Sequence, residues 1–256
     1  MTPYDKLKSL PQAEGYLKPG AVQFQYSHDG VRSWAYDTSL PSTARPGYST
    51  SGTVAMLVGP TGGLDLFLAP APGTASSPAT LWQSNSSGGS WVGHSVPCGF
   101  SPCAVALAVG PAGELVAGCG SEPGTGQQPK SIAVSSNNGT TWKTVLACQF
   151  SLTIPTTCLH SPLVNGYLGE LVVPISTRIV LVGSRSPLLV SSNGGTSWAP
   201  SPSVAADCRG GTLQIHFLNS QVGFLLGDDA NLGEDPVIWR TSDGGSSWTT
   251  VSSQRK

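Results

Sequence analysis

A short motif recurs along the chain, and its spacing constrains the fold more than any other feature. The last copy reads Thr-Ser-Asp-Gly-Gly-Ser-Ser-Trp and ends at Trp248, and earlier copies end at Trp34, Trp91, Trp142 and Trp198. Successive copies are therefore 57, 51, 56 and 50 residues apart. A repeat of roughly 50 residues is typical of folds that stack one small structural unit several times. We therefore expect a repeat architecture.

Each repeat reads as four short strands separated by turns. In the last repeat, alternating or apolar runs cover residues 212–218, 222–227, 236–240 and 248–251, with clusters of Gly, Asn, Asp and Ser between them. Short strands bounded by turn residues at regular spacing are typical of all-β folds, and no stretch shows helical periodicity. The sequence predicts an all-β protein, a β-propeller of four-stranded antiparallel blades. The strands of each blade are named A, B, C and D in chain order.

The same pattern fits three earlier repeats, so we expect four complete blades. Their predicted strands cover 53–58, 64–69, 80–83 and 91–96, then 104–109, 114–118, 131–135 and 142–146, then 168–175, 178–183, 187–191 and 198. The segment from Ala21 to Tyr36 supplies only C and D strands, which is half a blade. Residues 1–20 are polar, and residues 21–256 are expected to form one propeller domain. The sequence leaves open whether this is an unusual five-blade ring, part of a longer propeller, or a ring completed by a neighbouring chain.

The pattern Ser/Thr-x-Asp-x-Gly-x-Ser/Thr-Trp resembles the Asp-box, or BNR repeat, of sialidases, sortilin-type receptors and photosystem II assembly factors. The resemblance implies that these residues are structural and lie away from the active face. The Asp or Asn is expected to accept hydrogen bonds from its own turn, the Gly to adopt a positive φ, and the Trp to pack against the sheet. The residues concerned are Asp29, Trp34, Gly88, Trp91, Asn137, Gly139, Trp142, Asn193, Gly195, Trp198, Asp243, Gly245 and Trp248.

The lengths of the connections predict which face of the propeller binds ligands. Antiparallel alternation places the A–B and C–D turns at one end of the blades and the B–C and D–A loops at the other. The A–B turns are short, whereas the D–A loop from Ala147 to Tyr167 and the B–C loop from Gly227 to Pro236 are long. Binding residues concentrate on such loops. The candidates on this loop face are Asp228, Asp229, Glu234, Asp235, Arg209, Arg185, His160 and Tyr167.

Six cysteines lie on or beside the loop face: Cys98, Cys103, Cys119, Cys148, Cys158 and Cys208. Cys98–Cys103 and Cys148–Cys158 lie within single D–A loops and are the favoured disulfides, which leaves Cys119–Cys208. Zinc binding and free buried thiols are the alternatives, although no Cys-x-x-Cys pair is present. Disulfides indicate an oxidising compartment. We therefore expect an extracellular or periplasmic protein, although no signal peptide is visible.

Composition argues against several classes of partner. Only 11% of the residues are charged and the net charge is −1, so a basic surface for nucleic acid is not expected. The apolar runs are too short to span a membrane. The acidic loop over residues 228–235 offers oxygen atoms to a hard cation but lacks EF-hand spacing. We expect neither a cofactor nor a metal.

The favoured function is that of a non-catalytic binding or scaffolding propeller that recognises a glycan or a protein through the loop face. The alternatives are a sialidase-like glycoside hydrolase and an assembly factor resembling the photosystem II group. Sialidases carry an Arg-Ile-Pro tripeptide, a Tyr-Glu nucleophile pair and an Asp that acts as the acid, and none of these has a match here. Glycoside hydrolysis usually needs two carboxyl groups on either side of the bond, and only Asp228 or Asp229 suggests one. The sequence therefore favours a binding protein over an enzyme.

Overall fold

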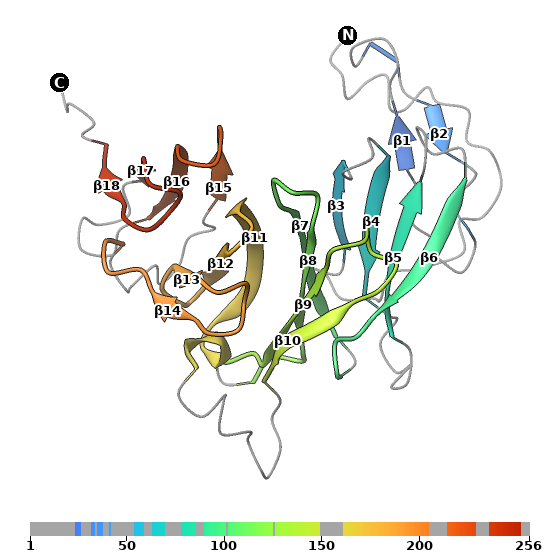
Figure 1. The fold of residues 1–256 in the computed structure, drawn as a ribbon, viewed down its shortest axis with the longest axis horizontal. Coiled ribbons are helices and arrows are strands. Elements are labelled where there is room, and N and C mark those ends of the chain that lie inside the picture. Colours follow the sequence, from blue (N-terminus) through green and yellow to red (C-terminus); the bar gives the residue numbers. More distant parts are fainter. Residues whose placement is uncertain are drawn as a thin grey trace, which may run out of the picture.

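A computed structural model describes residues 24–26, 32–33, 35–37, 41, 54–58, 63–69, 78–84, 90–100, 102–124, 126–148, 161–204, 214–228 and 236–251. These residues form β-strands, turns and one short 3-10 helix, η1 (Pro162–Val164). Four of the sheets are antiparallel and four-stranded (Figure 1). The predicted all-β fold is confirmed.

Each four-stranded sheet corresponds to one predicted blade. Blade 1 contains β3 (Val54–Val58), β4 (Leu64–Leu68), β5 (Ala79–Ser84) and β6 (Trp91–Val96). Blade 2 contains β7 (Ala104–Val109), β8 (Leu115–Gly120), β9 (Lys130–Ser135) and β10 (Lys143–Ala147). Blade 3 contains β11 (Tyr167–Ile175), β12 (Arg178–Ser184), β13 (Leu189–Ser191) and β14 (Ala199–Pro200). Blade 4 contains β15 (Gln214–Phe217), β16 (Gly223–Asp228), β17 (Pro236–Thr241) and β18 (Thr249–Thr250).

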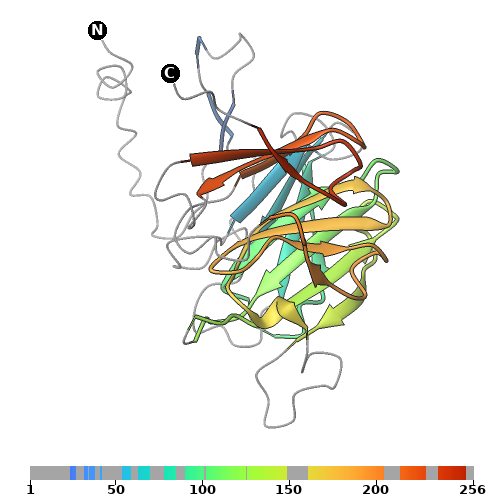
Figure 2. The same ribbon diagram turned by 90° about the vertical axis from the view of Figure 1, so that its left-hand side faces the viewer.

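The blades are arranged as in a propeller. Within each sheet the strands follow the order A, B, C, D. The four A strands are neighbours in space, because β3 contacts β7, β7 contacts β11, and β11 contacts β15. The sheets therefore fan outwards from the A strands (Figure 1). The turned view places η1 at the end of the molecule opposite to β1 (Phe24–Tyr26) and β2 (Ala35–Asp37) (Figure 2).

The hydrophobic core is divided among the spaces between blades. Phe67 and Leu81 of blade 1 pack with Leu115 of blade 2. Ile132 of blade 2 belongs to the next cluster, which also contains residues of blade 3 such as Leu181. A further cluster joins blade 3 to blade 4. Each fully buried large apolar side chain stabilises the fold by roughly 2 kcal/mol, so contact between neighbouring blades is a principal source of stability.

Three copies of the repeated motif form the same hydrogen-bonded turn. In blade 3, Asn193 Oδ1 accepts from Ser197 N over 2.9 Å, and Ser191 Oγ accepts from Gly195 N over 2.8 Å. The equivalent bonds form around Asn137 in blade 2 and Asp243 in blade 4. The side chains of Trp198 and Trp248 are buried between blades. These contacts agree with a turn-stabilising role. Three members of the predicted set, Asp29, Trp34 and Gly88, lie outside the described residues.

The N-terminal repeat contains a short hairpin. Strand β1 pairs with β2 in a separate two-stranded sheet, at the positions predicted for C and D strands. That this hairpin is half of a further blade stays a prediction. The division into a polar segment over residues 1–20 and one domain over residues 21–256 also stays a prediction.

Candidate functional site

The structure brings together two of the residues predicted for the loop face. Tyr167 is the first residue of β11 and pairs with Ser184, the last residue of β12. Arg185 follows Ser184, so the sheet register places it next to Tyr167. The Cζ atom of Arg185 lies 5.6 Å from the centroid of the Tyr167 ring, and its Nη1 lies 3.5 Å from Tyr167 Oη. The pair forms a cation–π contact, and Arg185 remains exposed to solvent.

The backbone at Arg185 is unusual. Its φ is 57°, in the left-handed region, where a residue with a side chain is less stable by about 1 kcal/mol or more. Neighbouring Gly166 is also left-handed, with φ 62°, and a Cβ atom there would lie 2.3 Å from Ser184 O. The β11 and β12 ends therefore approach closely, and this approach positions the Arg185–Tyr167 pair. Strained backbone that persists in a fold is often associated with function.

The structure places the backbone of one further predicted ligand-binding residue. Asp228 is the last residue of β16, where the B–C loop of blade 4 begins. The remaining predicted residues, Asp229, Glu234, Asp235, Arg209 and His160, lie outside the described residues.

The favoured pairing of Cys98 with Cys103 is wrong. Cys98 forms a disulfide with Cys119, with Cα atoms 5.6 Å apart, so the pairing of Cys119 with Cys208 is also wrong. Ser131 Oγ donates to Cys98 O over 2.7 Å, and Ser131 is the sheet partner of Cys119. This contact holds Cys98 of blade 1 beside β8 of blade 2, a relationship between blades that sequence spacing does not reveal.

The remaining described cysteines differ from each other. Cys103 is a free thiol whose Sγ donates to Ser121 O over 2.9 Å. Burial, followed by the nearby charge of Glu122, raises the pKa of the Cys103 thiol, which disfavours the reactive thiolate. Cys148 is disulfide-bonded, whereas Cys158, its favoured partner, lies outside the described residues.

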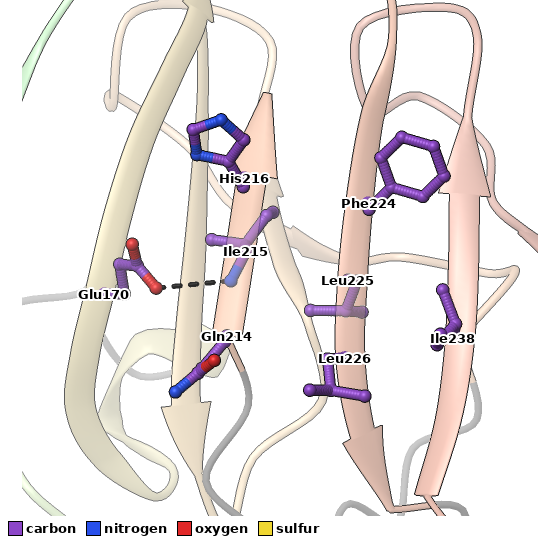
Figure 3. Close-up of a pocket in the computed structure, with 8 residues that line it drawn as sticks. All are labelled: Glu170, Gln214, Ile215, His216, Phe224, Leu225, Leu226 and Ile238. Atoms are coloured by element: carbon purple, nitrogen blue, oxygen red, sulfur yellow. Dashed lines mark hydrogen bonds between the residues drawn. The ribbon is translucent and has the colours of Figure 1, made fainter. Parts of the chain in front are cut away.

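A cavity of about 570 Å³ lies against blade 4 (Figure 3). It is lined by Glu170 of β11, by Gln214, Ile215 and His216 of β15, by Phe224, Leu225 and Leu226 of β16, and by Ile238 of β17. Its volume is in the range of small-molecule sites, which combine apolar walls with a few polar groups. Leu226 and Ile238 are exposed.

The polar groups of this cavity come from two neighbouring A strands. Glu170 Oε2 accepts a hydrogen bond from Ile215 N over 3.2 Å, and the His216 imidazole lies on the same side of β15 (Figure 3). Burial raises the pKa of Glu170, while the bond from Ile215 and the charge of His216 oppose this rise. The arrangement can donate and accept protons or hydrogen bonds beside an apolar wall.

Neither Glu170 nor His216 was predicted as a site residue from the sequence. One signal was present, because the sheet pairings make His216 equivalent to Val172 in blade 3 and to Ala108 in blade 2. A polar residue therefore replaces an apolar one at a repeated position of the A strand. The proximity of His216 to Glu170 depends on the contact between strands β11 and β15 of neighbouring blades. The sequence of one repeat does not reveal such a contact.

Within the described residues, no group of three or more His, Cys, Asp or Glu side chains is placed to hold a metal ion. No helix among them is long and apolar enough to cross a membrane.

No protein-family model and no curated protein sequence matches the chain. Among solved structures, YCF48 bound to D1 peptide is 14% identical, with a TM-score of 0.49 over 89% of this chain and 60% of that chain. A protein of unknown function from Dyadobacter fermentans DSM 18053 is 16% identical, with a TM-score of 0.48 over 77% of this chain and 67% of that chain. The α-L-arabinanase of Penicillium chrysogenum, complexed with arabinobiose, is 13% identical, with a TM-score of 0.47 over 78% of this chain and 66% of that chain. The chain thus spans about two thirds of these proteins or less.

Proposed function

We propose that this chain is a non-catalytic binding or scaffolding propeller that recognises an acidic group of a glycan or a protein through its loop face. The observation that carries the proposal is the exposed guanidinium of Arg185 on the ring of Tyr167. A guanidinium has five N–H donors, and only one of its nitrogens contacts Tyr167 Oη. The other donors suit a carboxylate, sulfate or phosphate group, which arginine can bind through two parallel hydrogen bonds.

The surroundings of the pair support this role. The Tyr167 ring limits the conformational freedom of the arginine, so less entropy is lost when a ligand binds. The disulfide between Cys98 and Cys119 is consistent with the extracellular or periplasmic location that we propose. We also propose that the repeated turns are Asp-boxes, which would leave the loop face for binding.

An array of neutral, uronate-bearing, sulfated and sialylated glycans, together with acidic peptides, tests this function. We expect the wild type to bind acidic members and Arg185→Ala to weaken that binding by at least about tenfold. Arg185→Lys should restore little of it, because an ammonium lacks the planar fork of donors. Tyr167→Ala should weaken binding by a smaller factor.

Lys143→Ala is the matched control, because Lys143 is an exposed cation on β10 and takes no part in the pair. This variant should bind as the wild type does. If Arg185→Ala binds as strongly as the wild type, the proposal is contradicted. It is also contradicted if Lys143→Ala loses as much affinity as Arg185→Ala.

A sialidase-like glycoside hydrolase is the second candidate, and the cavity on blade 4 favours it. The raised pKa of Glu170 is the property required of a general acid. Glu170 is, however, the single carboxyl group among the described residues that line the cavity, and two are normally needed. We therefore rank hydrolysis below binding. Turnover of a panel of chromogenic glycosides by the wild type, with its loss in Glu170→Gln, would reverse this ranking.

A further inference from the structure

Lys130 is a buried lysine whose amino group is surrounded by main-chain oxygen atoms. Its side chain is 1% exposed. Nζ lies 3.0 Å from Gln128 O, 2.8 Å from Leu163 O, 3.0 Å from Asn165 O and 2.9 Å from Gly166 O, so its three N–H groups are shared among four acceptors. Three of these four acceptors belong to the short segment that precedes β11.

The position of Lys130 relative to the D–A loop of blade 2 is informative. The chain leaves the described residues after Cys148 and returns at Ser161. Cys148 N donates to Lys130 O over 2.9 Å, and the Lys130 side chain binds the segment from Leu163 to Gly166. Lys130 therefore contacts the chain on both sides of this loop, through its main chain on one side and its side chain on the other.

The same contacts extend to the Arg185–Tyr167 pair. Tyr167 directly follows Gly166, one of the residues bonded to Lys130. On the other side of Tyr167, Leu168 N donates to Gln128 Oε1 over 2.6 Å. Tyr167 thus lies between two residues, Gly166 and Leu168, that are both hydrogen-bonded to the segment Gln128–Lys130 of blade 2.

Burying an amino group is energetically costly, and a purely apolar side chain would avoid that cost. What an apolar side chain cannot do is donate hydrogen bonds to three inward-facing carbonyl groups of one segment. Unsatisfied buried carbonyl groups favour other conformations in which water reaches them. The chemistry of Lys130 therefore matches the need to hold this segment in one conformation.

We propose that Lys130 is the positioning residue of the binding surface: its amino group holds Leu163–Gly166 so that Tyr167 is presented to Arg185. The inference rests on the proposed function of that surface. Lys130 itself does not contact the ligand, so replacing it changes affinity through the position of Tyr167.

Hydrogen exchange followed by mass spectrometry tests the positioning without any ligand. In Lys130→Met, the peptide covering residues 162–168 should exchange its amide hydrogens faster by at least about tenfold, while the amides of β15–β17 in blade 4 exchange at the wild-type rate. Lys143→Met, an equal change at an exposed lysine, should leave both regions unchanged. Lys130→Ala leaves space for n-propylamine, which should slow exchange in residues 162–168 again.

Binding of the acidic ligand is then measured for the same variants. Lys130→Met should bind at least about tenfold more weakly, and n-propylamine should restore binding to Lys130→Ala. Wild-type exchange in residues 162–168 of Lys130→Met overturns the inference. So does unchanged affinity of Lys130→Met for a ligand that Arg185→Ala no longer binds. If Lys130→Met does not fold, failure of n-propylamine to restore Lys130→Ala overturns it instead.

The two proposals fail in distinguishable ways. If the wild type binds no member of the array, the proposed function fails, while the exchange rates still decide whether Lys130 holds the segment. If Arg185→Ala abolishes binding and Lys130→Met changes neither exchange nor affinity, the function stands and the positioning role fails.

Discussion

Arg178 of blade 3 donates from Nη1 to the main-chain oxygen of Asp243 in blade 4, over 2.7 Å. The same nitrogen lies 3.2 Å from Gly244 O. A side chain at the start of one B strand is thus hydrogen-bonded to the C–D turn of the next blade. The contact joins neighbouring blades through polar groups as well as through the apolar core.

Replacement of Arg178 by Met should lower the free energy of unfolding by about 1–2 kcal/mol, because hydrogen bonds from a charged donor are lost while the apolar stem is kept. Urea denaturation measures this value. Lys143→Met serves as the control and should change stability by less than about 0.5 kcal/mol. An Arg178→Met protein as stable as that control would show that the contact between blades contributes nothing.

Gly194 and Gly195, adjacent in the turn of blade 3, should differ in their tolerance of a side chain. Both have a positive φ, but a Cβ atom at Gly195 would lie 3.0 Å from Val145 and 3.2 Å from Ile132 of blade 2, whereas one at Gly194 meets nothing within 4 Å. Gly194→Ala should cost about 1 kcal/mol from backbone strain alone, and Gly195→Ala about 2–3 kcal/mol. Equal midpoints in urea would contradict close packing of this turn against blade 2.

The fold was predictable because the repeat encodes it locally. The strand expected at 178–183 is observed at Arg178–Ser184, since turn residues and apolar alternation mark strand ends directly. The disulfide of Cys98 with Cys119 was not predictable, because it joins two blades whose approach is set by packing. The role of Lys130 was not predictable either, because its hydrogen-bond partners are main-chain oxygen atoms, which every residue carries. Arg185 and Tyr167 were both assigned to the loop face, but their contact was not predicted, because it depends on the register that pairs Tyr167 with Ser184.

Removal of Cys98 or Cys119 should destabilise the protein, whereas Cys103→Ser should not. The two cysteines of the disulfide are 21 residues apart in the sequence, and closing a loop of that size contributes roughly 3 kcal/mol to the free energy of unfolding. Cys119→Ser should therefore lower the free energy of unfolding by about that amount. Peptide mapping of the unreduced wild type should show Cys98 joined to Cys119, and recovery of a Cys98–Cys103 peptide would refute the assignment.

Ionisation of Asp243 should make the free energy of unfolding depend on pH in the acidic range. Burial opposes ionisation of this carboxyl group, but hydrogen bonds from Ser247, and also from Thr241 and Ser246, outweigh it and lower its pKa to about 2. The ionised form is therefore favoured by folding, so its contribution is present above about pH 4 and is lost as the pH falls towards 2. Asp243→Asn introduces the residue found at Asn137 and Asn193, and should flatten the dependence of unfolding free energy on pH between 4 and 2. An unchanged slope would mean that another group causes the acid sensitivity.

Lys130 should produce a dependence of the same sign, but at higher pH. Burial lowers the pKa of its amino group to about 7, below the value of about 10.4 of an unfolded chain. Between these values the unfolded chain binds more protons than the folded one, so the free energy of unfolding should rise with pH by up to roughly 1.4 kcal/mol per unit. Lys130→Met should lack this rise, while Lys143→Met should retain it. Urea denaturation of the three proteins from pH 6 to pH 10 measures the slopes. Parallel slopes in wild type and Lys130→Met would mean that the amino group stays protonated in its cage of carbonyl oxygens throughout this range.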